Sequence, residues 1–251
     1  MLLHGLGATA ALNWDASIPT LARHFRVLAP DLRGHGRGIR CGARFRLDDC
    51  ADDVAALLRQ EHLGPALIAG YSMGGPVAQL LALRHPRLVA GLVLCATARD
   101  FRGRPGERAT FGALGLTTFA SRFTPAIPAA RLRAPWVPRL AGTLVAELGG
   151  HEQRALLAAA ASLGTFTSRD WVADLTAPAV VVATTRDRVV PPRRQQKLAA
   201  SLGAPVIELA AGHFVPRTDP HALATAIVSA ARALPRRRSQ RPGQRQRRTA
   251  A

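Results

Sequence analysis

Hydrophobic and polar positions along the chain follow two alternating patterns. Short apolar runs bounded by turn residues predict buried strands, and longer amphipathic stretches predict helices. In one helical stretch Val54, Leu57 and Leu58 recur at helical spacing behind acidic first turns. Strand signals lie at 26–31, 66–70, 88–96, 178–185 and 204–210, and helix signals lie at 47–61, 74–86, 192–203 and 219–234. This alternation predicts an α/β fold, a mostly parallel sheet with helices on both faces.

Residues 98–176 interrupt this alternation. They lack a strand signal, carry helical patches at 110–123 and 152–164, and are punctuated by prolines. We expect a helical insertion between two strands of the sheet. The predicted division is a core of residues 1–97 and 177–235, the insertion at 98–176, and a separate tail at 236–251.

The sequence Gly70-Tyr71-Ser72-Met73-Gly74 stands between the strand signal at 66–70 and the helix signal at 74–86. A strand, a tight turn and a helix form the context of a nucleophile elbow, in which glycines leave room for the crossing backbone. Such a turn would expose the Ser72 hydroxyl at the carboxyl end of the sheet. Ser72 is therefore the candidate nucleophile.

A serine hydroxyl needs a general base and an orienting carboxylate. His213 follows the strand at 204–210 and Asp187 follows the strand at 178–185, so both lie at carboxyl ends. Asp100, after the strand at 88–96, is a weaker candidate acid. Four other histidines are expected to face solvent or to have structural roles: His24, His62, His85 and His221. A fifth, His151, could approach the pocket from above.

Two backbone N–H groups are candidates for an oxyanion hole. Met73 follows the candidate nucleophile at the start of a helix, where the N–H groups lack helical acceptors. The motif "LLHGLG" at residues 2–7 places a His-Gly loop after an apolar run, and we assign the second donor to Leu6.

Together these residues resemble the α/β-hydrolase superfamily, in its serine-nucleophile, capped, esterase-like branch. The resemblance spans nearly the whole chain, because "LLHGLGAT", "APDLRGHG", "GYSMGG", "TTRDRVVPP" and "AGHFVP" follow in the family's order. It implies that residues 98–176 cap the pocket and that Gly34 and Gly36 form a sharp turn after a strand. It also implies no metal and no organic cofactor.

A serine at the elbow disfavours family branches that use aspartate there, including haloalkane dehalogenases and typical epoxide hydrolases. The leading interpretation is a serine hydrolase that cleaves a carboxylic ester or related acyl bond of a small-molecule substrate through an acyl-enzyme on Ser72. An acyltransferase, a perhydrolase or a C–C bond hydrolase would use the same triad, and a non-catalytic binding protein would keep only the fold. Large apolar residues of the insertion either form the cap's own core or line the pocket: Phe111, Phe119, Phe123, Trp136, Leu140 and Trp171. In the second case the pocket is apolar and suits an acyl chain.

The formal net charge of +18 changes this picture little. Seven arginines lie in the tail "RRRSQRPGQRQRR" at 236–248, which has no apolar periodicity and is expected to be disordered. No aromatic interleaving or binding motif accompanies these charges, so we do not expect nucleic acid as the partner.

The remaining composition points to the cytoplasm. No apolar run approaches the ~18 residues of a membrane helix, and no basic segment precedes the first apolar residues as in a secretory signal. Cys41, Cys50 and Cys95 fit neither a zinc site nor a disulfide framework, so we interpret them as ordinary thiols.

The start of the chain departs from the family pattern. Family members carry two or more strands before the His-Gly loop, whereas Met1 falls inside the strand that leads into it. We therefore expect that Met1 is an internal methionine or a misassigned start, and that the natural protein carries an N-terminal extension.

Overall fold

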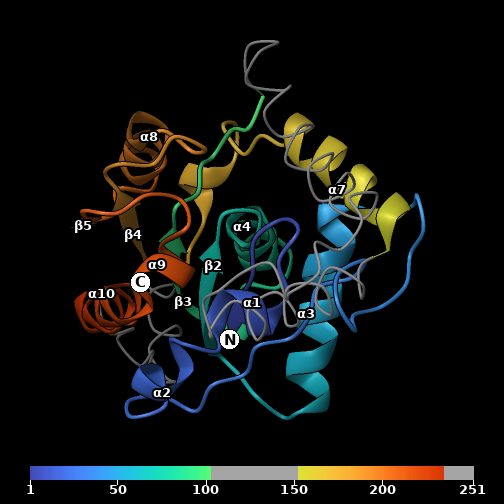
Figure 1. Ribbon diagram of the computed structural model, residues 1–251, viewed down its shortest axis with the longest axis horizontal. Coiled ribbons are helices and arrows are strands. Elements are labelled where there is room, and N and C mark those ends of the chain that lie inside the picture. Colours follow the sequence, from blue (N-terminus) through green and yellow to red (C-terminus); the bar gives the residue numbers. More distant parts are fainter. Residues whose placement is uncertain (103–151, 235–251) are drawn as a thin grey trace, which may run out of the picture.

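The strands of the computed structural model, which describes residues 1–102 and 152–234, form one sheet (Figure 1). In this described part, five strands lie in the order of the sequence, and each neighbouring pair is parallel. The strands are β1 (Leu2–Leu3), β2 (Ala66–Tyr71), β3 (Val89–Cys95), β4 (Ala179–Thr184) and β5 (Val206–Leu209). The carboxyl ends of all the strands therefore lie along one edge of the sheet.

Helices connect these strands. The helices are α1 (Ala10–Trp14), α2 (Ile18–Leu21), α3 (Leu47–Gln60), α4 (Gly74–Arg84), α7 (Gln153–Thr165), α8 (Pro192–Leu202), α9 (Val215–Thr218) and α10 (Pro220–Ala233). Two short 3₁₀ turns, η1 (Pro86–Leu88) and η3 (Val172–Asp174), precede β3 and β4. None of the helices in the described residues is long and apolar enough to cross a membrane.

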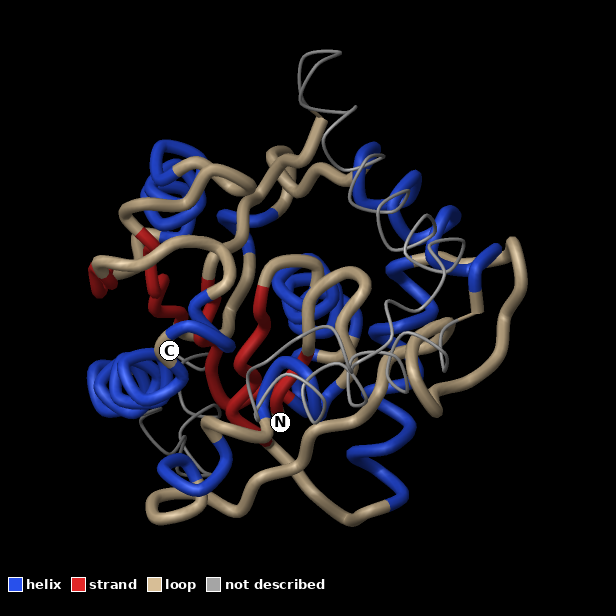
Figure 2. Tube along the Cα trace, in the orientation of Figure 1, coloured by secondary structure: helices blue, strands red, loops and turns tan. Residues whose placement is uncertain are grey.

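The two faces of the sheet carry separate hydrophobic cores, because successive side chains of a strand point to opposite faces. Ile68 and Leu92 pack in one core with buried residues of α3, α4 and α8. Ala69 and Val93 pack in the other core with Trp14 and buried residues of α10. Figure 2 shows helices on both sides of the strands. The predicted α/β architecture with helices on both faces is confirmed.

The prediction of a strand at 26–31 is wrong, because this segment forms no strand. It lies beside β1 and accepts one backbone hydrogen bond, from the Leu2 N–H to the Leu28 carbonyl oxygen at 2.8 Å. Two physical reasons explain the difference. The neighbouring strand has only two residues, and Pro30 has no N–H to donate. The other strands and helices form within a few residues of their predicted positions, and Asp219 caps α10 by accepting from the Ala222 N–H.

Only part of the predicted insertion belongs to the described residues. Helix α7 forms at the helical patch predicted over 152–164. Trp171 packs against the core that contains α3 and α4, and its ring contacts the ring of Phe166. The patch at 110–123, His151, the other apolar residues named for the cap and the tail at 236–251 lie outside the described residues. The division into core, cap and tail therefore stays a prediction.

The three cysteines are free thiols, as expected. Cys50 and Cys95 are buried, and burial raises the pKa of both thiols well above the usual range. Cys41 is half-buried, and partial burial also raises the pKa of its thiol. All three groups are therefore protonated, poor nucleophiles at neutral pH.

Helix α4 begins so close to the sheet that glycine is needed at the contact. A Cβ atom at Gly70 would overlap the Gly74 carbonyl group, and one at Gly74 would overlap the Leu3 carbonyl group. A Cβ atom at Gly75 would overlap the side chain of Thr97. The backbone of α4 therefore rests directly on β1, β2 and the loop after β3.

We expect Gly75→Ala to lower the free energy of unfolding by ~1–3 kcal/mol, because the added methyl group must push Thr97 or α4 aside. Urea denaturation would measure the change. Gly164→Ala is the matched control, since a Cβ atom there meets no atom of the described residues within 4 Å. This second substitution should leave stability unchanged or raise it by ~0.5–1 kcal/mol, because alanine favours the helix. Equal stability of the two variants would contradict the close-contact argument.

Candidate active site

Ser72 occupies a strained turn between β2 and α4. Its φ of +50° lies in the left-handed region, which is unfavourable for a residue with a side chain. The end of β3 holds this conformation in place. The Ser72 N–H donates to the Cys95 carbonyl oxygen at 3.0 Å, and the Thr97 hydroxyl donates to the Ser72 carbonyl oxygen at 2.7 Å. Such an over-determined strained residue is a feature of functional sites.

The structure brings the three predicted residues Ser72, His213 and Asp187 into one hydrogen-bonded chain. His213 Nε2 lies 3.0 Å from Ser72 Oγ, and His213 Nδ1 lies 2.8 Å from Asp187 Oδ2. Since an ionised carboxylate only accepts hydrogen bonds, Nδ1 carries the imidazole proton and Nε2 accepts from the serine hydroxyl. The three residues follow β2, β5 and β4, so their meeting follows from the parallel sheet.

Asp187 is buried and fully engaged. Its Oδ1 accepts from the Val189 and Val190 N–H groups, each at 2.8 Å. Its Oδ2 accepts from the Thr184 hydroxyl at 2.8 Å, besides the bond with His213. These donors fix the carboxylate and compensate for its burial, because hydrogen bonds to a charged acceptor are the strong ones.

Gln195 extends the chain of hydrogen bonds behind Asp187. Its Nε2 donates to the Thr184 hydroxyl oxygen at 2.9 Å and to the Val190 carbonyl oxygen at 2.7 Å. Its Oε1 accepts from the Thr184 N–H at 3.0 Å. The sequence analysis did not identify Gln195 or Thr184, because amide and hydroxyl residues near a strand end carry no distinctive pattern.

Tyr71 bonds to the backbone of His213. Its hydroxyl donates to the His213 carbonyl oxygen at 2.6 Å, and the two rings lie 5.7 Å apart. Burial, with the charge of Asp187 as a smaller cause, raises the pKa of Tyr71 far above its usual range. The hydroxyl therefore stays a neutral donor. Sequence reasoning also missed this role, although Tyr71 directly precedes Ser72.

The loop with Leu6 packs directly against the candidate nucleophile. A Cβ atom on Gly5 would lie 3.3 Å from Ser72 Cβ, and Leu6 lines the same cavity as Ser72. Met73 directly follows Ser72 at the N-terminus of α4 and is fully buried. The positions of Leu6 and Met73 suit two amide donors near Ser72; their role as an oxyanion hole stays a prediction.

The segment "PDLRGHG" gives this loop its support. Asp31 Oδ1 accepts from the Ala10 N–H at 2.7 Å, and Asp31 Oδ2 accepts from the Arg37 N–H at 2.9 Å. His4 Nε2 accepts from the Leu32 N–H at 2.9 Å. Gly34 and Gly36 have φ values of +73° and +49°, so the sharp turn implied by the family resemblance is present. This segment is scaffold for the site.

Ser72 and His213 line a cavity of about 190 Å³. Its lining is mainly apolar and includes Leu12, Leu156 of α7 and Phe214. The Phe214 side chain is 60% exposed beside His213. The cavity could therefore hold an apolar group next to the serine hydroxyl.

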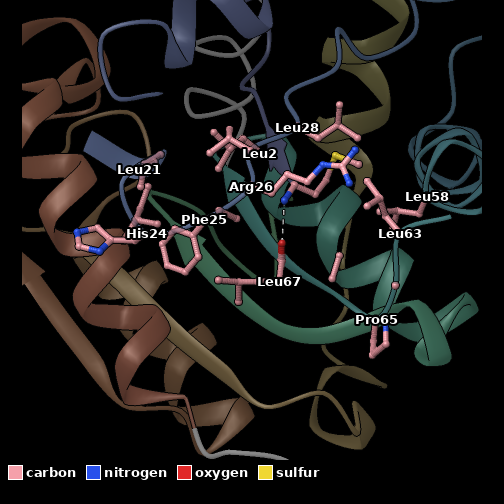
Figure 3. Close-up of a pocket in the computed structure, with 16 residues that line it drawn as sticks. Leu2, Leu21, His24, Phe25, Arg26, Leu28, Leu58, Leu63, Pro65 and Leu67 are labelled. Atoms are coloured by element: carbon pink, nitrogen blue, oxygen red, sulfur yellow. Dashed lines mark hydrogen bonds between the residues drawn. The ribbon is translucent and has the colours of Figure 1, made fainter. Parts of the chain in front are cut away.

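A larger cavity of about 410 Å³ lies at the amino ends of the strands. Figure 3 shows Leu2, Phe25, Leu58 and Leu67 among its labelled lining residues. It contains none of the three candidate catalytic residues. The smaller cavity is the candidate site, because it is lined by a strained serine and by the histidine that bonds to both this serine and the buried Asp187.

Asp100, the alternative acid, is placed differently. Its carboxylate accepts from the Arg102 N–H at 2.8 Å and forms an ion pair with Arg169 at 2.5 Å. Asp187, not Asp100, accepts from His213. Among the remaining histidines, His24, His62 and His221 are exposed as expected. His85 is half-buried and contacts Asp52 at 2.7 Å.

A parallel sheet whose strand ends join a serine, a histidine and an aspartate is the arrangement of α/β-hydrolases. Residues 1–226 match the family model described as the alpha/beta hydrolase family. The chain therefore belongs to the alpha/beta hydrolase family.

Three individual proteins illustrate the likeness. The putative carbamate hydrolase RutD of Serratia proteamaculans is 30% identical over 237 residues, which cover 87% of this chain and 85% of that protein. Pimeloyl-acyl-carrier-protein methyl ester esterase of Sodalis glossinidius is 44% identical over 101 residues. This second match covers 40% of the chain and spans only 37% of the esterase's length. The crystal structure of a hydrolase from Pseudomonas aeruginosa PA01 superposes with a TM-score of 0.74 at 29% identity, covering 92% of this chain and 88% of that one.

Proposed function

We propose that the chain is a serine hydrolase that cleaves a carboxylic ester or a related acyl bond through an acyl-enzyme on Ser72. The observation that carries the proposal is the hydrogen-bonded chain from Ser72 through His213 to Asp187, with distances of 3.0 Å and 2.8 Å. This arrangement activates a hydroxyl that is otherwise a weak nucleophile.

In the first half-reaction, Ser72 Oγ attacks the carbonyl carbon of the substrate while His213 Nε2 takes the hydroxyl proton. The carbonyl oxygen becomes an oxyanion, which the N–H groups of Leu6 and Met73 would stabilise. The tetrahedral intermediate then expels the alcohol, and His213 gives its proton to the departing oxygen. Asp187 holds the imidazole in the required tautomer and stabilises its positive charge.

In the second half-reaction, water replaces the alcohol. His213 Nε2 takes a proton from the water as its oxygen attacks the acyl carbon. Collapse of the second tetrahedral intermediate breaks the bond to Ser72 Oγ, which regains its proton from His213. The products are a carboxylic acid and the free enzyme. Transfer to an alcohol or to peroxide would follow the same steps with another acceptor.

The substrate class rests on the cavity and on the relatives. The lining residues Leu6, Leu12, Leu156 and Phe214 suit an apolar acyl group. The two curated relatives are named as a carbamate hydrolase and a methyl ester esterase. A small ester with an apolar acyl group is therefore the substrate to test first, in a series of increasing acyl length.

Ser72→Ala should abolish ester hydrolysis, with a loss in kcat on the order of 10⁴–10⁶-fold, because the nucleophile is removed. A fluorophosphonate probe should label the parent and not the variant, and circular dichroism should show that both are folded. A folded parent that the probe does not label would favour a non-catalytic binding protein. Ester turnover by the variant within tenfold of the parent would exclude Ser72 as the nucleophile.

Asp187→Asn should lower kcat on the order of 10⁴-fold, because an asparagine favours the wrong histidine tautomer. The matched control is Asp100→Asn, which removes a buried carboxylate that bonds to arginines instead of the histidine. This control should affect thermal stability more than turnover. Steady-state kinetics and melting temperatures of both variants would decide, and the opposite order of kcat losses would reassign the acid to Asp100.

A further inference from the structure

Asn13 reaches from helix α1 to the loop that carries Leu6. Its side-chain Oδ1 accepts from the Gly5 N–H at 3.1 Å. Because this partner is a donor, the oxygen of the carboxamide must face Gly5 and the Nδ2 group must face away. Asn13 also lines the cavity that contains Ser72. A Cβ atom on Gly5 would lie 3.7 Å from Asn13 Oδ1 and 3.8 Å from Ser72 Oγ, so the carboxamide lies close to the nucleophile.

The peptide between Gly5 and Leu6 is oriented from both sides. The Gly5 carbonyl oxygen accepts from His4 Nδ1 at 2.8 Å and from the Ala8 N–H at 3.3 Å. In a trans peptide the N–H points away from the carbonyl oxygen, so these bonds also set the direction of the Leu6 N–H. Asn13 fixes the preceding peptide, whose N–H belongs to Gly5. His4 and Asn13 therefore hold Gly5 at its carbonyl and at its amide.

The free-energy cost of burying an asparagine at position 13 indicates that this residue has a functional role. Asn13 is 5% exposed, and its Nδ2 is buried without a hydrogen-bond partner among the described residues. A buried unsatisfied donor costs ~1–3 kcal/mol. An apolar side chain of similar size would avoid this cost but could not accept from Gly5. Residues that break a packing rule in this way are expected mainly at functional sites.

We propose that Asn13 is a positioning residue of the oxyanion hole: through the Gly5 N–H it holds the loop so that the Leu6 N–H faces the oxyanion formed at Ser72. This inference rests on the proposed function. Asn13 itself donates nothing to the reacting atoms. Its loss should therefore weaken the binding of the tetrahedral intermediate and leave the binding of the ground-state ester unchanged.

The test compares Asn13→Ala and Asn13→Leu with the parent on a p-nitrophenyl ester that the parent hydrolyses. Loss of one oxyanion-hole donor costs ~10²–10³ in kcat, and a misplaced donor should cost less. We expect kcat to fall about 10–100-fold, with KM within about twofold. The leucine variant fills the space of the carboxamide, so it remains informative if the alanine variant does not fold.

A second readout uses a trifluoromethyl ketone as a transition-state analogue. Ser72 Oγ adds to its carbonyl carbon, the hydroxyl proton passes to His213, and the carbonyl oxygen becomes an oxyanion. The inhibition constant should rise in each Asn13 variant by the factor that kcat/KM loses, because both report on the same oxyanion. An unchanged inhibition constant, or a rise in KM alone, would overturn the proposal.

Ser17→Ala is the control for general loosening of the N-terminal segment. Ser17 is buried, and its hydroxyl donates to the Pro220 carbonyl oxygen at 3.1 Å, away from the loop with Leu6. The melting temperature of this variant should fall, while its kcat and inhibition constant should stay at parental values. Equal kinetic losses in both positions would overturn the specific role of Asn13. The same assay measures hydrolysis by the parent and by Ser72→Ala. If the parent hydrolyses the ester and Ser72→Ala does not, the proposed function holds even when the proposed role of Asn13 fails.

Discussion

Strand β2 and helix α4 cross at Gly70 and Gly74 with no side chain between them, and the candidate site depends on this crossing. A Cβ atom at either glycine would overlap a backbone carbonyl group. The short distance forces the turn between them into a conformation that gives Ser72 a positive φ. The same turn places Ser72 between the carboxyl end of β2 and the N-terminus of α4. One steric constraint thus sets the position of the proposed nucleophile and of the residue proposed as one oxyanion donor.

The parallel sheet converts this local geometry into a site. Ser72, Asp187 and His213 are far apart in the sequence, but each follows a strand, and all strands end along one edge. The Thr184 hydroxyl donates to Asp187 and accepts from Gln195, and these bonds help to fix the carboxylate. The N-terminal loop reaches the same edge from β1 and is held by buried polar contacts. A displacement of β2, β4 or β5 would change a distance between Ser72, His213 and Asp187.

The sequence predicted the features that depend on local pattern. Apolar runs located the longer strands, and the Ser72 motif, Asp187 and His213 could be found because each stands directly after a strand signal. The prediction of a strand at 26–31 failed because strand pairing depends on the neighbouring strand, and β1 has only two residues. Tyr71, Gln195 and Asn13 could not be found for a related reason. Each of them forms hydrogen bonds with residues of another element or of a distant part of the sequence. No rule of residue spacing predicts such contacts.

Two residues of the site are poorly suited to the fold that holds them. Ser72 has a left-handed backbone conformation that costs a residue with a side chain ~1–2 kcal/mol, and glycine would adopt it freely. Asn13 buries an amide nitrogen without an acceptor among the described residues. Under the proposed function, thermal stability and turnover therefore make opposite demands at these two positions. A laboratory selection for thermal survival alone should accept glycine at position 72, so the hardiest variants from such a selection would include inactive ones.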